Sequence, residues 1–525
     1  MFDILITNAR IVDGTGSPAF EGSIGIKGEK ITAIGDLSES QAGAIIDANG
    51  LAVSPGFIDV HAHSEFTLLA DPRGEGKVMQ GVTTEVSGNC GLSAGPLYGD
   101  YFERRKGDLE ELGLELSWHD LKDYFRLLEE KGTSLNFATL IGHGNLRGSV
   151  VGYGNRKPTS EEMERMKSLL RESMKAGGFG LSSGLIYPPG VYSETDELIE
   201  LAKVVKEFGG IYASHMRSEG DRLLEAITEA IKIGEEGGIP VQISHLKTGG
   251  ERNWHKLEEA FELIETARER GVDVTAYRYP YTASSTDLDA ILPSWAYEGG
   301  ADEELKRLSD PETREILKKE ILTQHPKEDY WEKVMVAAVD SERNRGFEGK
   351  TMAEVAREMK KEPCEALFDF LLEEKLRISA IYFSMSEENL RKILRKEYVM
   401  IGSDSSARAI NGPTRLGKPH PRTFGSFPRV LSKFVREEKV LTLEEAVRKM
   451  TSLPARRLGL NDRGVIKAGA FADLVVFNPE RVHDTAGYTA PYAYPMGIRH
   501  VMVNGTFVVK DGAHTGEKPG KVLRK

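Results

Sequence analysis

Both ends of the chain carry short stretches of alternating or clustered β-forming residues. At the N-terminal end such stretches lie at residues 4–6, 11–12, 23–27 and 30–34, with a hairpin turn signal at Gly28-Glu29. At the C-terminal end they lie at residues 472–477, 501–503 and 506–509, with a type I′ turn signal at Asn504-Gly505. Neither end can bury a core alone, so we expect one small β-sandwich domain that combines residues 1–54 with residues 461–525.

Between these ends, apolar strand-like segments alternate with amphipathic helical segments. Thr159 and Glu162 form a capping box at the start of a helix that Gly177-Gly178 ends. Strand patterns then follow at 180–185, 211–215, 240–245 and 272–277, and helix patterns at about 194–208, 222–236 and 256–270. This order predicts an α/β fold with a parallel sheet, and its length favours a TIM-like (β/α)8 barrel over residues 55–460, although an open sheet would show the same alternation.

The stretch 282–395 interrupts this rhythm. It is rich in charged residues and helix formers and is too long for one loop between a strand and a helix. We therefore expect a helical insertion late in the barrel.

The composition narrows the class of protein and its partners. The 525 residues carry a net charge of −12, which argues against nucleic acid or an anionic membrane as a partner. The sequence shows no signal-peptide pattern and no apolar run long enough to span a bilayer. Only two cysteines are present, so a disulfide framework is excluded. We expect a cytoplasmic enzyme with a small-molecule substrate. The sequence is also compatible with a homo-oligomer.

Candidate metal ligands begin with two histidines at the end of an apolar strand. His61 and His63 are two residues apart, so strand alternation points both side chains to the same face. Converging neutral imidazoles suit a cation such as zinc. By themselves, two core or surface histidines explain the pattern equally well.

Two further histidines end successive predicted strands. His215 in Ser-His-Met-Arg is echoed by His245 in Ser-His-Leu-Lys, 30 residues on, which is about the length of one βα unit. In a barrel, both would lie at the carboxyl rim where active sites are built. Two unrelated buried histidines would not be expected to share this position.

A cysteine and an aspartate complete the candidate site. Cys90 lies in a glycine-flanked loop after the predicted strand 82–86, where a thiolate between imidazoles would be deprotonated by a metal. Cys364 begins a predicted helix, and we interpret it as structural. Asp404 follows the last predicted strand, where it would act as general base, although its position taken by itself is explained better by a helix N-cap.

The complete set resembles the amidohydrolase superfamily, and its finer motifs resemble the D-aminoacylase, or N-acyl-D-amino-acid deacylase, family. The likeness spans essentially the whole chain. The motifs are Ser-Gly-Asn-Cys-Gly at 87–91, Gly-Leu-Ile-Tyr-Pro-Pro-Gly at 184–190, Tyr-Pro-Tyr-Thr-Ala-Ser-Ser-Thr at 279–286, His-Pro-Arg at 420–422 and Lys-Met-Thr-Ser-Leu-Pro-Ala at 449–455. One departure is Tyr277-Arg278, where the family implies a smaller acidic or amide-bearing pair.

The resemblance implies zinc-dependent hydrolysis of the amide bond of N-acyl-D-amino acids. It implies a tight zinc on Cys90, His215 and His245, and a second, weaker site with His61, His63 and the shared Cys90. It makes Asp404 the catalytic base and acid. The residues that it implies for substrate binding are Tyr187, Lys247, Tyr279, Ser285 and Arg415.

Three alternatives remain at this stage. A hydantoinase-like or dihydroorotase-like hydrolase of cyclic amides would use a carboxylated lysine to bridge two metals, where this chain offers Cys90. A D-specific dipeptidase would use the same site on another linear amide. A non-enzymatic scaffold paralogue would be expected to have lost ligands, whereas all five candidates and Asp404 are present.

Overall fold

Strands from both ends of the chain form one sheet in the computed structural model, which describes residues 1–525. The order of this nine-stranded sheet is β21-β20-β19-β18-β5-β1-β2-β3, with β4 beside β1. The N-terminal strands are β1 (Phe2–Ile11), β2 (Phe20–Lys27), β3 (Lys30–Gly35), β4 (Ala42–Asp47) and β5 (Ala52–Pro55). The C-terminal strands are β18 (Leu474–Phe477), β19 (Ile498–Val503), β20 (Thr506–Lys510) and β21 (Ala513–His514).

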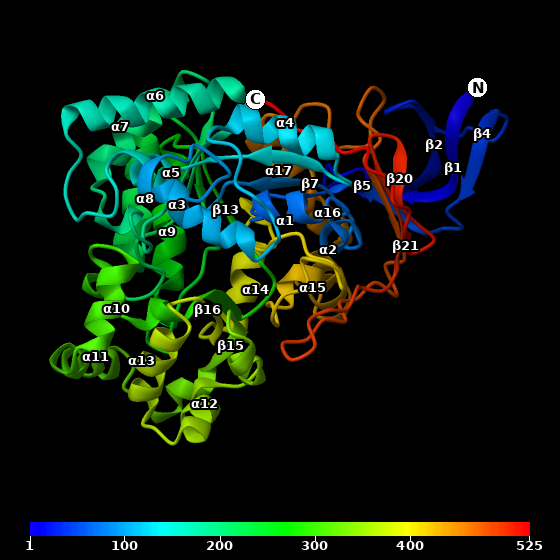
Figure 1. The fold of residues 1–525 in the computed structure, drawn as a ribbon. Coiled ribbons are helices and arrows are strands. Elements are labelled where there is room, and N and C mark those ends of the chain that lie inside the picture. Colours follow the sequence, from blue (N-terminus) through cyan, green and yellow to red (C-terminus); the bar gives the residue numbers. More distant parts are fainter.

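Local sequence explains the hairpins of this terminal sheet. Asn504 and Gly505 have φ of 48° and 79°, the left-handed conformation that a type I′ turn requires, and they join β19 to β20. Alternating isoleucines such as Ile24 and Ile26 on β2 are buried in a core shared with the C-terminal Leu474. The sheet lies to one side of the molecule and carries the N-terminus, whereas the C-terminus lies near α4 (Figure 1).

The middle of the chain contains the parallel strands that the sequence pattern predicts. One parallel sheet has the order β6-β7-β8, and another has the order β17-β13-β12-β11-β10-β9. Their bounds are β6 (Phe57–Asp59), β7 (Val82–Ser87), β8 (Asn136–Thr139), β9 (Ile141–Gly142), β10 (Gly180–Gly184), β11 (Ile211–His215), β12 (Val241–Ile243), β13 (Val274–Arg278) and β17 (Val399–Ile401). A parallel bridge between Ala62 and Ser405 links the ends of β6 and β17, and only Leu140 separates β8 from β9.

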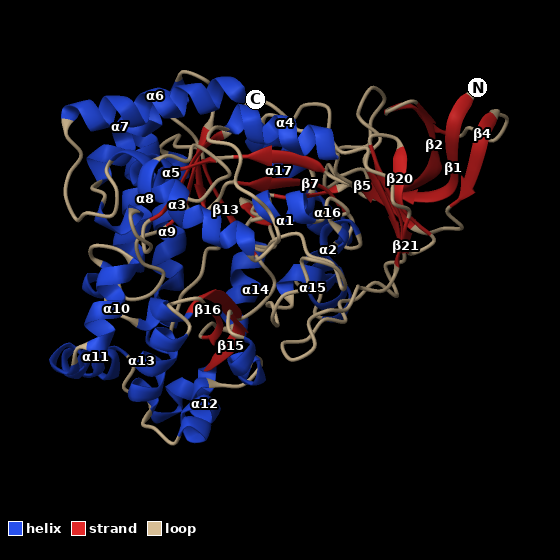
Figure 2. Ribbon diagram, in the orientation of Figure 1, coloured by secondary structure: helices blue, strands red, loops and turns tan.

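Helices cover the outside of these strands (Figure 2). Before β13 in the chain they are α1 (Glu65–Ala70), α2 (Glu75–Val78), α3 (Gly99–Glu110), α4 (Leu121–Lys131), α5 (His143–Val150), α6 (Ser160–Ala176), α7 (Thr195–Lys206), α8 (Leu223–Gly237) and α9 (Leu257–Glu269). After β17 come α15 (Arg422–Arg429), α16 (Leu443–Met450) and α17 (Ser452–Leu458). On α8, Leu223, Ala226, Ile227 and Ala230 are buried at helical spacing, so this face packs against β12.

The capping box predicted at Thr159 is confirmed. The Thr159 side chain accepts from the backbone N–H of Glu162, whose side chain accepts from the backbone N–H of Thr159, and α6 ends at Gly177 with φ of 122°. The helix boundaries follow from local chemistry here because both ends have residues that satisfy unpaired backbone groups.

The insertion after β13 is not purely helical, contrary to the sequence-based expectation. It holds α10 (Ala301–Ser309), α11 (Pro311–Gln324), α12 (Met352–Met359), α13 (Pro363–Glu373) and α14 (Glu387–Arg395), but also an antiparallel sheet of order β14-β16-β15. Its strands are β14 (Ala283–Asp287), β15 (Val334–Val339) and β16 (Ile378–Phe383). These strands are far apart in sequence, so their pairing leaves no local signal among the charged helices.

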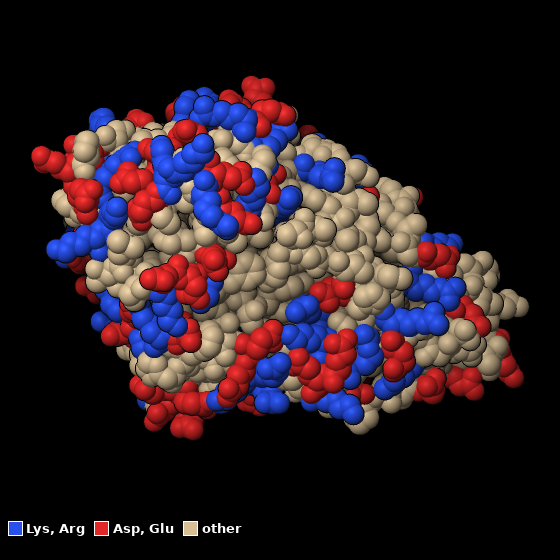
Figure 3. All heavy atoms as spheres, turned by 90° about the horizontal axis from the view of Figure 1, so that it is seen from below, with Lys and Arg blue, Asp and Glu red and all other residues tan.

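The surface carries many side chains of both charges, as the charged fraction of the sequence indicates. Figure 3 shows acidic and basic side chains interspersed over one face, with an uncharged area in its middle. No helix of the structure has both the length and the apolar character needed to cross a membrane.

Candidate metal centre

Five candidate metal-ligand side chains and one aspartate converge at the carboxyl ends of the parallel strands. His61 and His63 follow β6, Cys90 follows β7, His215 ends β11, and His245 follows β12. Asp404 comes after β17, and its backbone N–H donates to the carbonyl of His61 at 2.9 Å. Parallel pairing alone brings these residues to one edge, because every strand ends there.

The donor atoms form two overlapping groups. In one group, His61, His63, Cys90 and Asp404 each offer an atom within 4.8 Å of the others, and in the second Cys90, His215 and His245 do so. The sulfur of Cys90 belongs to both and lies 3.2 Å from His61 Nε2 and 3.7 Å from His245 Nε2. Both ring nitrogens of His215 are buried without a hydrogen-bond partner in the protein. An orphaned imidazole beside a thiol fits a metal ion that takes nitrogen and sulfur ligands.

The backbone is strained where the ligands are presented. Cys90, His245 and Asp404 have φ of 52°, 36° and 53°, in the left-handed region that side chains with a Cβ rarely adopt. Each such residue costs about 1–2 kcal/mol relative to ordinary helical backbone. Surrounding hydrogen bonds hold the three residues in this conformation, and backbone strain of this kind is concentrated at functional sites.

Burial sets the protonation of the ligands. It lowers the pKa of both His61 and His215 to about 4, so both imidazoles are neutral at pH 7 and free to bind a metal. Burial likewise raises the pKa of the Cys90 thiol well above its ordinary value. A bound cation would therefore have to displace the proton of Cys90, as zinc does with coordinating thiols.

Asp404 is kept ionised by a residue that the sequence interpretation did not assign to the site. Burial alone would raise the pKa of Asp404, but Arg422, whose Nη1 lies 2.8 Å from Oδ2, and hydrogen bonds from His61 and His63 hold it well below its ordinary value. Arg422 stands in the His-Pro-Arg motif at 420–422, which was the available signal. An ionised carboxylate among neutral imidazoles is suited to accept a proton.

Arg415 makes its contact elsewhere. Its side chain is exposed and its guanidinium stacks 5.1 Å from the ring centroid of Tyr492. The structure therefore does not bring Arg415 together with the other predicted substrate contacts, and Arg422 is the arginine beside Asp404.

Glu219 is a second residue that the sequence interpretation missed. Its carboxylate oxygen Oε1 lies 2.5 Å from His245 Nδ1 and also binds the ammonium of Lys247, which itself lies 2.8 Å from Nδ1. Glu219 and Lys247 thus occupy the Nδ1 side of His245, and Nε2 is left to face Cys90 as a candidate ligand. Burial would raise the pKa of Glu219, but His245 and Lys247 outweigh it and hold the carboxyl ionised. No sequence spacing marks Glu219, which lies in the loop after β11.

The remaining predicted substrate contacts lie around the centre. Tyr187 places its ring 5.0 Å from that of His215 and its hydroxyl 2.9 Å from the Thr286 hydroxyl. The ring of Tyr279 lies 4.8 Å from the Arg422 guanidinium and 6.0 Å from the Lys247 ammonium. The carbonyl of Ser285, on β14, accepts a long bond of 3.4 Å from Arg422.

Tyr277 also belongs to this neighbourhood. It is fully buried on β13, its ring lies 4.5 Å from that of His61, and its hydroxyl has no partner in the protein. The unusual Tyr277-Arg278 pair in the sequence was the signal for it. A buried hydroxyl without a partner beside a ligand is available to a bound molecule.

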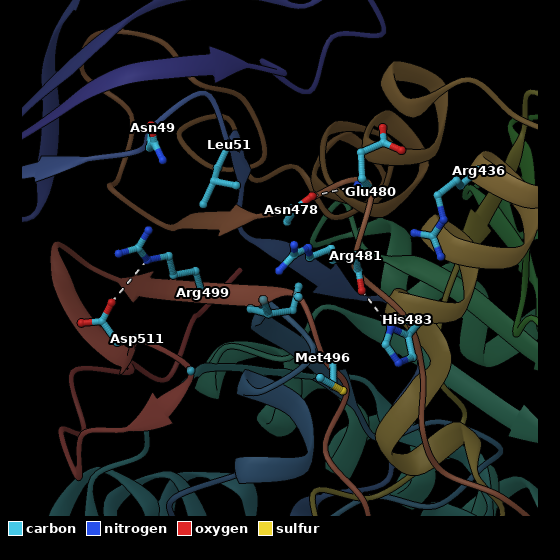
Figure 4. A pocket seen from close by; sticks show the side chains of 13 residues that line it. Asn49, Leu51, Arg436, Asn478, Glu480, Arg481, His483, Met496, Arg499 and Asp511 are labelled. Carbon is cyan, nitrogen blue, oxygen red and sulfur yellow. Dashed lines mark hydrogen bonds and ion pairs between the residues drawn. The ribbon is translucent and has the colours of Figure 1, made fainter.

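One surface cavity lies away from this centre. It measures about 720 Å³ and lies between the terminal sheet and the segment that follows β18, where Arg436, Arg481 and Arg499 line it (Figure 4). Arg499 is paired with Asp511, and Arg436 donates to the backbone carbonyls of Pro479 and Val482. None of the strand-end ligands lines this cavity, so it is separate from the candidate metal centre.

Comparisons with known proteins agree with this geometry. Residues 44–509 match the model of the amidohydrolase family. The chain is 37% identical to a D-aminoacylase from Alcaligenes xylosoxydans xylosoxydans, over 100% of this chain and 98% of that protein. It is also 37% identical to an N-acyl-D-glutamate deacylase from the same organism, over 100% of this chain and 96% of that protein.

A solved structure shares the whole fold. The N-acyl-D-glutamate deacylase from Bordetella bronchiseptica, crystallised with zinc and a phosphonate that mimics the tetrahedral intermediate, superposes with a TM-score of 0.85. It is 34% identical to this chain, and the match covers 100% of both chains.

Proposed function

Because this chain belongs to the amidohydrolase family, we propose that it is a zinc-dependent hydrolase that cleaves the amide bond of N-acyl-D-amino acids. The products are a carboxylic acid and a free D-amino acid. One observation carries this proposal. The ionised carboxylate of Asp404 lies within 3.4 Å of the imidazoles of His61 and His63. The thiol of Cys90 lies close both to these two histidines and to His215 and His245. The full-length relatives that act on N-acyl-D-amino acids supply the substrate class.

Cys90, His215 and His245 would hold the tight zinc, and His61 and His63 would form a second, weaker site with the shared Cys90. When bound, zinc polarises the acyl carbonyl and makes a water molecule more acidic. The donor set favours this ion because a thiolate with two imidazoles is a typical zinc environment. Cys90 also stands where a hydrolase of cyclic amides would need a carboxylated lysine, so the linear amide is the better-supported substrate.

The protein supplies the proton transfers. Asp404 Oδ1, held 3.2 Å from His63 Nε2, accepts a proton from the attacking water. Arg422 on Oδ2 keeps the carboxylate ionised for this step. After the tetrahedral species forms, Asp404 returns the proton to the departing amine nitrogen as the C–N bond breaks.

We propose that the substrate carboxylate binds near the cationic side chains of Lys247 and Arg422. Both guanidinium and ammonium groups form strong charge-assisted hydrogen bonds with carboxylates. Tyr187, Tyr279 and Ser285 would complete the pocket through hydroxyl groups. Lys247 is paired with Glu219 and Arg422 with Asp404, so the substrate carboxylate would share both cations with these acidic groups.

We further propose that the parallel strands close into a TIM-like (β/α)8 barrel with the terminal sheet as a separate β-sandwich domain. The order β6-β7-β8, the short step to β9, the order β9-β10-β11-β12-β13-β17 and the Ala62–Ser405 bridge support a closed ring. The site would then occupy the carboxyl rim, as in other barrels.

The direct test is a panel of N-acetyl-D-amino acids and N-acetyl-L-amino acids assayed by release of the free amine. We expect zinc-loaded enzyme to hydrolyse the D-series and to favour it strongly over the L-series. Equal rates on both series, or a preference for L, would refute the stereochemical assignment. D-dipeptides in the same panel separate a dipeptidase from a deacylase.

A further inference from the structure

A fully buried lysine lies beneath the candidate active site and has no part in the chemistry described above. Lys77, on the short helix α2, has 0% of its side chain exposed. Its ammonium donates to Asp59 Oδ2 at 2.6 Å, Ser403 Oγ at 2.7 Å and the carbonyl of Ser405 at 2.9 Å. One cation therefore contacts both residues that flank Asp404.

The same cation contacts the strand that carries the histidines. Asp59 is the last residue of β6, and His61 and His63 follow it directly. The carboxylate of Asp59 also accepts from the backbone N–H of Ser403 at 2.8 Å and from its hydroxyl at 2.5 Å. Lys77 and Asp59 thus form a buried pair that links the end of β6 to the end of β17.

The backbone at this junction needs such a link. Asp404 has φ of 53°, and the backbone that follows β17 meets the backbone that follows β6 through the Ala62–Ser405 bridge and the backbone bonds beside it. Donors on both sides of Asp404 fix the two neighbouring peptides, which is what a strained residue requires to persist. Helix α2 is itself bound to the loop that follows β17, because the N–H of Gly76 donates to the carbonyl of Arg408 at 2.7 Å.

The charges of this cluster balance. Glu85 Oε2 lies 3.9 Å from Lys77, and burial raises the pKa of Glu85 to about 8 although Lys77 opposes the shift. Glu85 is therefore largely protonated at pH 7 and accepts from the Ser64 hydroxyl at 2.9 Å. Asp59 is left as the single counter-ion of Lys77, and a paired charge is the form in which buried ions are retained.

We propose that Lys77, paired with Asp59, is a positioning residue that holds Asp404 in its working conformation. This inference rests on the proposed function, because the value of a fixed Asp404 lies in its role as base and acid. Lys77 touches neither substrate nor metal ligands, and it acts through Ser403 and Ser405. Catalysis depends steeply on such positioning, since a displacement of about 1 Å costs up to ~100-fold in rate.

The test variant removes both charges. Lys77→Met alone would leave Asp59 as a buried, unpaired carboxylate and destabilise the fold, so Lys77→Met is combined with Asp59→Asn. The matched control is Lys449→Met. Lys449 has 0% of its side chain exposed and donates to the carbonyl of Val399, at the start of the same strand β17. Lys77 contacts residues after the carboxyl end of β17, whereas Lys449 contacts the start of this strand.

Two measurements are made on zinc-loaded full-length protein. In the double variant we expect kcat to fall about 10–100-fold with KM within about threefold and zinc content unchanged. We also expect faster amide hydrogen exchange in peptides 57–64 and 399–407. Lys449→Met is expected to lower Tm while kcat remains within about twofold of wild type.

The outcomes separate the two proposals. Wild-type kcat in the double variant, with or without faster exchange, overturns the positioning role. An equal loss of kcat in Lys449→Met also overturns it, because any damage to β17 would then suffice. If wild-type protein hydrolyses no N-acyl amino acid, the proposed function fails, and the exchange measurement alone decides whether Lys77 orders the Asp404 segment.

Discussion

The contact between Glu219 and His245 predicts that a residue outside the ligand set controls zinc affinity. The change is Glu219→Gln, which keeps the size of the side chain and removes its charge. In the wild type, the Glu219 carboxylate lies 2.5 Å from His245 Nδ1 and neutralises Lys247, whose ammonium lies 2.8 Å from Nδ1. The variant keeps an oxygen acceptor but leaves Lys247 without a counter-ion beside a candidate metal ligand.

The expected magnitude follows from these two contacts. A charge-assisted hydrogen bond contributes about 1.5–3 kcal/mol, roughly twice a neutral one, so the amide loses about 0.75–1.5 kcal/mol. At about 1.4 kcal/mol for each factor of ten, this corresponds to roughly a 3–12-fold weaker Kd. The uncompensated Lys247 adds to the loss, and we expect zinc to bind about 10–100-fold more weakly in total, the usual range for such partners.

The assay is competition for zinc against a chromophoric chelator, with metal-free protein prepared under reducing conditions. The matched control is Glu229→Gln, because Glu229 is also an ion-paired glutamate with 14% of its side chain exposed, against 16% for Glu219. Glu229 binds Arg217 rather than a candidate ligand. A Kd within threefold of wild type in Glu219→Gln, or an equal weakening in Glu229→Gln, would refute the reasoning.

Four further outcomes are expected. Cys90→Ala should lose the tight zinc and all activity while keeping its circular dichroism spectrum, and full zinc content by mass spectrometry would contradict the ligand assignment. Asp404→Asn should bind zinc but lose about 10²–10⁴-fold in kcat, the contribution typical of general acid–base groups; turnover within a few-fold of wild type would point to another base. Arg422→Met should reduce kcat/KM by about 10–100-fold for N-acyl amino acids, with a smaller further loss for the matching carboxamides, because its charge-assisted bonds to the carboxylate are worth about 1.5–3 kcal/mol; an equal loss for both substrates would assign it to Asp404 alone. Tyr277→Phe should keep zinc and lower kcat/KM about 3–10-fold, the worth of one hydrogen bond from its unpartnered hydroxyl, and unchanged kinetics would make this tyrosine a packing residue.

Local patterns in the sequence predicted much of the secondary structure. The strand at 211–215 has the predicted bounds, and the turn at Asn504-Gly505 and the capping box at Thr159 follow from residues adjacent in the chain. The insertion was the exception. Its sheet β14-β16-β15 joins segments that lie far apart in sequence, so no local period announced it.

The residues of the candidate site also fall into two groups, those that the sequence predicted and those that it did not. Cys90, His215 and His245 could be proposed from sequence because each lies at the end of a strand, and the ends of parallel strands meet at one edge. Arg422 and Glu219 could not be assigned in this way, because each reaches the site from a loop or helix of irregular length. Arg415 shows the same difficulty, since it is near Asp404 in sequence but stacks on Tyr492 instead.

The sequence by itself determined the residue types of the candidate metal centre, the order of the central strands and the sides to which their side chains point, because these depend on spacing along one chain. Only the tertiary structure decided which charges meet. Each of the pairs Arg422–Asp404, Glu219–His245 and Lys77–Asp59 joins residues from different elements or loops of the chain. Burial makes such contacts strong enough to set protonation and orientation, and the burial of a side chain is decided only when the chain has folded.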